Sequence, residues 1–133
     1  MSFVLDARLA GDTLSVAVLD GVDFRLMRDA RYWWLVLVPQ IDGAVEWQDL
    51  SSAEGLKLYE MSMHAAHKLR DLAQADKMNI GAFGNMVQQL HVHIIARHVG
   101  DAAWPGPVWG VGAAQDYAVD ALEARLKALR AVL

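Results

Sequence analysis

The chain has 133 residues, which is the size of one ordinary domain, and 55% of them are hydrophobic, which is enough to form a sizeable core. Its formal net charge of −4 argues against broad nucleic-acid binding, although a single phosphate can still bind where the surface is locally positive. Because the chain has no cysteine, disulfides and thiolate metal sites are excluded.

The sequence carries no sign of secretion or of a membrane span. The N-terminus lacks a charged segment followed by an apolar one, and the longest apolar run, at residues 32–39, is too short to cross a bilayer. No linker or repeat divides the chain. We therefore expect one domain over residues 1–133, in the cytoplasm, with no membrane partner.

Three strands are predicted in the first third of the chain. Residues 13–19 alternate between apolar and polar side chains, and the turn signal Asp20-Gly21 follows them. Residues 24–27 are a candidate second strand. Residues 33–38 are bulky and β-branched and stop at Pro39, which is typical of a central strand.

Two amphipathic helices are predicted, one in the middle of the chain and one at its end. The first begins with the capping-box pattern of Ser51 and Glu54 and is expected to run to about Gln74. The second is expected to begin at about Asp116. Apolar side chains recur at helical spacing in both, at Leu58, Met61, Ala65, Leu69 and Leu72 and at Val119, Leu122, Leu126, Leu129 and Leu133.

Two further strands lie between these helices, at residues 78–83 and 88–97, with a Gly84-Asn85 turn between them. A loop with two prolines and two tryptophans follows at residues 100–112. Adjacent strands joined by short turns pair antiparallel, so the order of elements predicts an α+β fold in which helices pack on a meander sheet.

The predicted strand at residues 88–97 presents polar side chains on one of its faces. Because side chains alternate along a strand, one face is apolar and is expected to meet the core. This apolar face comprises Leu90, Val92, Ile94 and Ala96. The other face presents an amide and two imidazoles, those of Gln89, His91 and His93, spaced about 6–7 Å apart, and continues with Ile95 and Arg97.

The spacing of these histidines leaves three interpretations open. They could lie on a solvated sheet face, or His91 and His93 could bind zinc, which requires a third ligand that His64, His67 and His98 are poorly placed to supply. They could also perform nucleophilic or acid–base chemistry near neutral pH. The glycine-containing turn within residues 79–87 favours the third interpretation, because glycines allow backbone N–H groups to turn toward an anion.

Residues 79–95, together with the Trp104-Pro105 pair, resemble the histidine-triad (HIT) superfamily of nucleotide hydrolases and transferases. The signature of that family is His-φ-His-φ-His-φ-φ, where φ is apolar. The matching register places Gln89 at the first histidine, His91 at the second and His93 at the third. The chain looks most similar to a bacterial HIT-like, diadenosine-tetraphosphate-hydrolase-like branch, which shares the tail seen here at residues 104–110.

The resemblance implies a HIT-like fold with about five strands per subunit, one long helix and a C-terminal helix. It also implies that His91 attacks the α-phosphorus of a nucleotide to form a phosphohistidine, while His93 binds a phosphate oxygen near the leaving group. The first residue of the triad would act through its backbone carbonyl, which orients the nucleophile and which Gln89 supplies equally well.

The resemblance implies further roles around these histidines. Asn85 and the backbone N–H groups of Met86 and Val87 would hold phosphate oxygens, and Asn79 would support the site. Arg28 and Asp29 lie where relatives hold the ribose. Trp104 and Trp109 are expected either to pack the tail or to reach a partner's site. Many relatives have another histidine soon after the position of Pro39, where this chain has Gln40-Ile41-Asp42.

We therefore expect a nucleotide phosphate hydrolase or nucleotidyl transferase that acts on a dinucleoside polyphosphate, a nucleoside phosphoramidate or a similar nucleotide, without a metal or other cofactor. The alternative is a module of the same fold that binds a nucleotide or phospho-ligand without turnover. We also expect a homodimer, because five tryptophans and so many apolar residues are hard to bury in one small domain. Relatives imply pairing through residues 56–72 and 79–83, with the tail at 104–110 near the other subunit's site.

Overall fold

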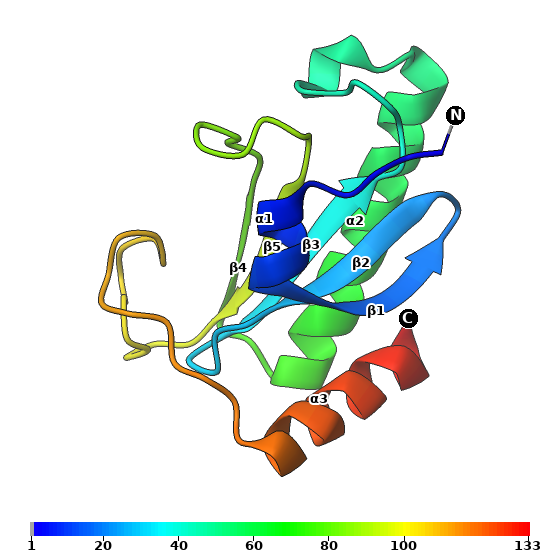
Figure 1. The fold of residues 1–133 in the computed structure, drawn as a ribbon. Helices are drawn as coiled ribbons and strands as arrows, with labels where there is room; N and C mark the ends of the chain where they lie inside the picture. The colour runs from blue at the N-terminus through cyan, green and yellow to red at the C-terminus, as the bar shows by residue number, and fades with distance from the viewer. Residues whose placement is uncertain (1) are drawn as a thin grey trace.

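A five-stranded antiparallel sheet forms the centre of the computed structural model, which describes residues 2–133 (Figure 1). In chain order the elements are α1 (Ala7–Asp12), β1 (Thr13–Leu19), β2 (Val22–Met27), β3 (Trp33–Pro39), a 3₁₀ turn (Trp47–Asp49), α2 (Ser52–Ala73), β4 (Lys77–Gly81), β5 (Val92–Arg97) and α3 (Val119–Val132). The strand order is β1-β2-β3-β5-β4, so β1 and β4 form the two edges. The expected α+β fold is confirmed.

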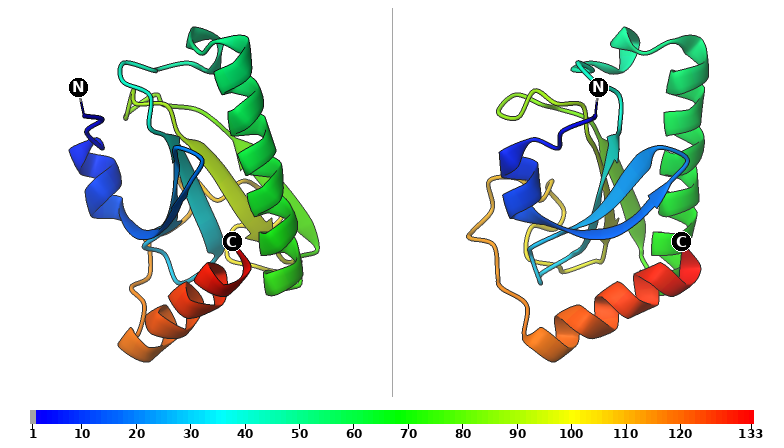
Figure 2. Two further views of the ribbon diagram at one scale, coloured as in Figure 1. Left: turned by 90° about the vertical axis from the view of Figure 1, so that its right-hand side faces the viewer. Right: turned by 45° about the vertical axis from the view of Figure 1, so that its right-hand side comes forward.

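The helices cover the sheet from both sides. α2 crosses one face, α1 lies against the other, and α3 lies beside one end of the sheet, as the turned views of Figure 2 show. α2 begins as expected, because the Ser51 hydroxyl accepts a hydrogen bond from the Glu54 N–H and the Glu54 carboxylate accepts one from the Ser51 N–H. Among residues 2–133 no helix is both long and apolar enough to cross a membrane.

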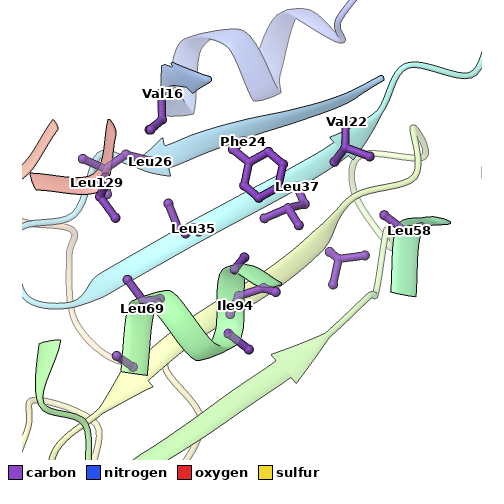
Figure 3. Packing of buried hydrophobic residues seen from close by; sticks show 14 of the residues in the cluster. Val16, Val22, Phe24, Leu26, Leu35, Leu37, Leu58, Leu69, Ile94 and Leu129 are labelled. Atoms are coloured by element: carbon purple, nitrogen blue, oxygen red, sulfur yellow. The ribbon is translucent and has the colours of Figure 1, made fainter. Parts of the chain in front are cut away.

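The main core lies between the sheet and α2, with α3 closing one end (Figure 3). Leu58, Ala65 and Leu69 of α2 are buried against Leu35 and Ile94, as the helical spacing predicted. In α3 the predicted apolar residues from Leu122 onward pack against this core, as expected. The first of them, Val119, does not, because its side chain is 71% exposed. A smaller cluster on the other face of the sheet joins Leu9 of α1 to side chains of β3, β5 and the tail, and the candidate site is built beside it.

Several predicted boundaries are wrong. β5 begins at Val92 rather than Gln88, so Gln89 and His91 precede the regular strand. Pro39 would lie opposite Leu90, but proline has no N–H to donate, and the Leu90 N–H instead donates to the carbonyl of Ala44. The ladder between β3 and β5 therefore ends at the pair Leu37–Val92.

Two other elements differ from the sequence prediction. α3 begins at Val119 rather than Asp116, because Gln115 is held in an extended segment by hydrogen bonds between its backbone and Ala30 and Asp29. α1 was not predicted; the carboxylate of Asp6 caps it by accepting from the N–H groups of Arg8 and Leu9. Strand β4 also ends at Gly81, two residues before the predicted Phe83.

We expect Leu69→Ala to lower the free energy of unfolding by about 2–5 kcal/mol, because its fully buried side chain would leave a cavity between α2 and the sheet. Val119→Ala, at an exposed position of α3 away from this core, is the control and should change it by less than about 0.5 kcal/mol. Urea unfolding monitored by tryptophan fluorescence measures both. Equal effects of the two substitutions would show that α2 does not pack on the sheet as described.

Candidate functional site

His91 and His93 lie side by side on the face of the sheet that α1 covers. The centroids of the two imidazole rings are 4.9 Å apart, and the residues are 7% and 6% exposed. The predicted alternation of faces is confirmed, since Leu90, Val92, Ile94 and Ala96 all belong to the main core on the opposite face.

A backbone carbonyl fixes the tautomer of His91. Its Nδ1 lies 2.7 Å from the carbonyl oxygen of Gln89. A carbonyl can only accept a hydrogen bond, so Nδ1 carries the hydrogen and donates it. In a neutral imidazole the other nitrogen then has a free lone pair. Nε2 of His91 is therefore available as a nucleophile.

An indole fixes the opposite tautomer in His93. The Nε1–H of Trp34, on β3, donates to Nδ1 of His93 over 3.0 Å. Nδ1 is therefore the acceptor, and the hydrogen of the neutral ring is on Nε2. Burial, reinforced by the neighbouring His91, lowers the pKa of His93 from 6.5 to about 3. His93 is thus a neutral hydrogen-bond donor whose ring lies next to that of His91.

The two imidazoles line a hollow of about 400 Å³. α1 contributes Arg8, Leu9 and Asp12 to its wall, and the loop after β4 contributes residues 83–87. This volume is in the range of small-molecule sites. A second hollow of about 240 Å³ borders His91 and is lined by residues 45–48 and 82–84. His91 therefore borders two hollows.

Aromatic rings form the wall next to His93. Trp109 packs edge-on against Phe83, with centroids 4.7 Å apart, and also contacts His93 at 5.1 Å. Trp34 completes the cluster at 5.8 Å from Trp109. Within the single chain, Trp109 of the tail therefore contacts His93.

The other tail tryptophan packs within its own chain. Trp104 does not line the hollow; its ring packs under the guanidinium of Arg97, which lies 5.6 Å from the ring centroid. Asn79 also supports this region rather than the histidines, because its side-chain oxygen accepts from Arg97 over 2.8 Å. Arg97 is held in turn by the carboxylate of Asp101. Trp104 and Asn79 thus contact Arg97, which in turn binds Asp101 in the loop that follows β5.

Asp29 does not present a free carboxylate to a ligand. It is 2% exposed and pairs with the guanidinium of Arg31 through two hydrogen bonds of 3.0 and 2.9 Å. Burial alone would raise the pKa of Asp29, but the bonds from Arg31 and from the Gln115 N–H outweigh it and lower that pKa. Arg31 also donates to the carbonyl of Val111. The pair of Asp29 and Arg31 therefore holds the tail that carries Trp109 in place. Arg28, by contrast, is exposed and lines a neighbouring hollow.

The side chain of Gln89 points toward the N-terminal segment. Its oxygen accepts from the N–H of Asp6 over 2.8 Å, and its nitrogen donates to the carbonyl of Val4 over 2.9 Å. The same residue thus orients His91 through its carbonyl and anchors through its amide the segment that leads into α1.

Charged groups of both signs, Arg8 and Asp12, line the hollow. Among the described residues that line it, Arg8 alone carries a permanent positive charge, and its exposed pair with Asp12 at 3.6 Å holds it weakly. Asn85, Met86 and Val87 lie on the same wall, next to Gly84, whose φ of +72° suits glycine. Within residues 2–133 no three histidine or carboxylate side chains gather as a metal site would require.

The sequence missed Trp34 and the α1 residues of this site. Nothing in the sequence of β3 shows that the indole of Trp34 meets an imidazole that lies 59 residues away. α1 is six residues long, and the Asp6 cap is its only local signal. The tail motif did contain Trp109, but the sequence could not decide which of its tryptophans enters the hollow.

Comparisons with known proteins agree with this geometry. A model of the HIT domain matches residues 11–100. A histidine triad protein from Bradyrhizobium japonicum is 39% identical, with a TM-score of 0.97 over 99% of this chain and 98% of that one. One from Sinorhizobium meliloti is 40% identical, with a TM-score of 0.95 over 98% of this chain and 97% of that one.

A third histidine triad protein, from Marinobacter aquaeolei, is 37% identical, with a TM-score of 0.97 over 100% of this chain and 97% of that one. A comparison with curated protein sequences gave no match. The matched domain covers most of the chain, and structures more than a third identical superimpose along its whole length. The chain therefore belongs to the HIT domain family.

Proposed function

We propose that this protein is a nucleotide phosphate hydrolase or nucleotidyl transferase that acts at an α-phosphate through a covalent intermediate on His91. One observation carries the proposal: the Gln89 carbonyl holds Nδ1 of His91 and leaves its Nε2 lone pair free, and the ring of His93, with its hydrogen on Nε2, lies 4.9 Å away between centroids. An imidazole nucleophile next to a neutral hydrogen-bond donor suits attack on a phosphorus whose leaving oxygen gains negative charge.

The reaction would proceed in two displacements. In the first, the Nε2 lone pair of His91 forms a bond to phosphorus while the bond to the leaving oxygen breaks, and that oxygen keeps the electron pair. His93 donates a hydrogen bond to a phosphate oxygen near the leaving group. In the second, water attacks phosphorus, Nε2 recovers its electron pair, and the proton that water loses passes to solvent. A hydroxyl or another phosphate in place of water would make the enzyme a transferase.

The walls of the hollow support a nucleotide as the substrate. The rings of Trp109, Phe83 and Trp34 offer an apolar surface to a nucleoside, and Arg8 offers charge to a phosphate. The turn that contains Asn85 brings backbone N–H groups to the same wall, which suits phosphate oxygens. A dinucleoside polyphosphate or a nucleoside phosphoramidate has both parts.

A binding module without turnover is the second candidate. It is favoured by Gln89 at the first triad position and by the lack of an imidazole in the turn after Pro39. The first departure carries little weight, because any residue at position 89 supplies the carbonyl that His91 uses.

We expect His91→Asn to lower kcat/KM on diadenosine tetraphosphate by at least about a thousand-fold, because removing a nucleophile typically costs several orders of magnitude. His67→Asn, an exposed histidine on α2, is the matched control and should leave the rate unchanged. Circular dichroism checks that both variants fold, and EDTA is present throughout because no metal should be needed. Near wild-type turnover in the folded His91→Asn protein would refute the assignment.

Gln89→Ala should cost far less turnover than His91→Asn, because the substitution keeps the backbone carbonyl. It removes two hydrogen bonds to the N-terminal segment, so we expect faster amide exchange at residues 6–10 and a loss of about 1–3 kcal/mol of stability. Gln88→Ala, at the exposed neighbouring position, is the control. A loss of turnover as large as that of His91→Asn would mean that the amide itself takes part in the reaction.

We also propose that the protein is a homodimer that pairs through β4 and α2. β4 is an edge strand, and the apolar side chains of Leu56, Tyr59, Ile80 and Phe83 on or next to these elements are at least 46% exposed. Such a surface is typical of an interface, and two-fold pairing is the commonest assembly.

Light scattering at micromolar concentration should give twice the chain mass of 14.7 kDa. Ile80→Lys should shift the protein toward a monomer, because it places a charge on the edge of β4. Val18→Lys, equally exposed on the opposite edge strand β1, should leave the dimer intact. A monomer mass for the wild type would refute the dimer.

A further inference from the structure

The hydrogen bond between Trp34 and His93 limits what His93 can do. An indole N–H can only donate, so the nitrogen that faces it must have its lone pair free. A protonated His93 would place an N–H directly against the Nε1–H of Trp34, over the 3.0 Å that now separates the two nitrogens. Trp34 itself is buried on β3, and its ring packs edge-on against that of Trp109.

The rings packed against His93 offer no negative charge that would stabilise a protonated imidazole. The side chains packed against it are Trp34 from β3, Phe83 from the loop after β4, Trp109 from the tail and the imidazole of His91. Among residues 2–133, the only charged groups on the same hollow are Arg8 and Asp12 of α1, which pair with each other. Burial and His91 accordingly place the pKa of His93 at about 3.

A neutral His93 with its hydrogen on Nε2 can donate a hydrogen bond but cannot donate a proton. Losing that hydrogen would leave an imidazolate anion in an apolar wall, which is far too costly. A general acid must hold a proton that it can give up near neutral pH. A leaving group in this site therefore receives a hydrogen bond only and has to depart with its own negative charge.

We infer that Trp34 is a positioning residue that makes the site selective for phosphoanhydrides over phosphoramidates. This inference rests on the proposed function. In a phosphoanhydride, the P–O bond breaks as the His91–P bond forms, and the electron pair stays on a phosphate oxygen, which is a stable anion without a proton. In a phosphoramidate, the P–N bond must break to give an amine, whose nitrogen needs a proton that His93 cannot supply.

The kinetic test compares leaving groups on one nucleotide. We expect wild-type kcat/KM to be at least ten-fold higher for diadenosine tetraphosphate than for adenosine 5′-phosphoromorpholidate. Across adenosine 5′-(aryl phosphates), kcat/KM should fall steeply as the pKa of the leaving phenol rises, because the phenol receives no proton. Equal rates on the first two substrates, or no dependence on the phenol, would overturn the inference.

Trp34→Phe keeps an aromatic ring but removes the donor. His93 can then take up a proton on Nδ1, so we expect the preference for the anhydride to shrink at least three-fold and morpholidate cleavage to increase as the pH falls. Trp33→Phe is the matched control, because Trp33 packs against Arg125 instead. An unchanged preference in a folded Trp34→Phe protein would overturn the role of Trp34.

Ring ¹⁵N chemical shifts give a readout that does not depend on turnover or on the variant. In the wild type, Nδ1 of His93 should have the shift of an unprotonated nitrogen from pH 5 to pH 8, and a protonated Nδ1 in that range would overturn the inference. The His91→Asn protein separates the two proposals. If it loses turnover while the wild type cleaves both substrates equally, the proposed function stands and this inference fails; if it retains turnover, both fail.

Discussion

The hydrogen bond from Nδ1 of His91 to the carbonyl of Gln89 is the interaction on which the rest of the site depends. It forms where the ladder between β4 and β5 has ended at the pair Gly81–His93, so the Gln89 carbonyl has no partner on β4. The carbonyl of Gln89 can then accept from the imidazole two residues further on. The early end of β4 thus leaves free the carbonyl that sets the tautomer of His91.

The two imidazoles have the same chemistry and opposite partners. His91 meets an acceptor at Nδ1 and exposes a lone pair at Nε2, whereas His93 meets a donor at Nδ1 and exposes a hydrogen at Nε2. Neighbours therefore give two identical residues opposite properties at Nε2, a free lone pair in His91 and a hydrogen-bond donor in His93. The surrounding wall depends on distant contacts, since the pair of Asp29 and Arg31 holds the tail that carries Trp109 to His93.

The sequence predicted the parts of this arrangement that follow from periodicity. Alternation along the strand placed His91 and His93 on one face, and helical spacing found the buried side of α2, both correctly. It could not show that Trp34 meets His93 or that Arg31 neutralises Asp29, because these contacts depend on where loops bring distant residues. It also missed the early end of the ladder, since Pro39 acts on the neighbouring strand rather than on its own.

The stereochemical course at the α-phosphorus tests the central claim most directly. A nucleotide substrate made chiral at that phosphorus with sulfur would be hydrolysed in water enriched in ¹⁸O, and the configuration of the product thiophosphate determined. Each in-line displacement inverts the configuration. Attack by His91 followed by attack by water therefore predicts overall retention. Inversion would show that water attacks the phosphorus directly, and it would contradict a covalent intermediate on His91.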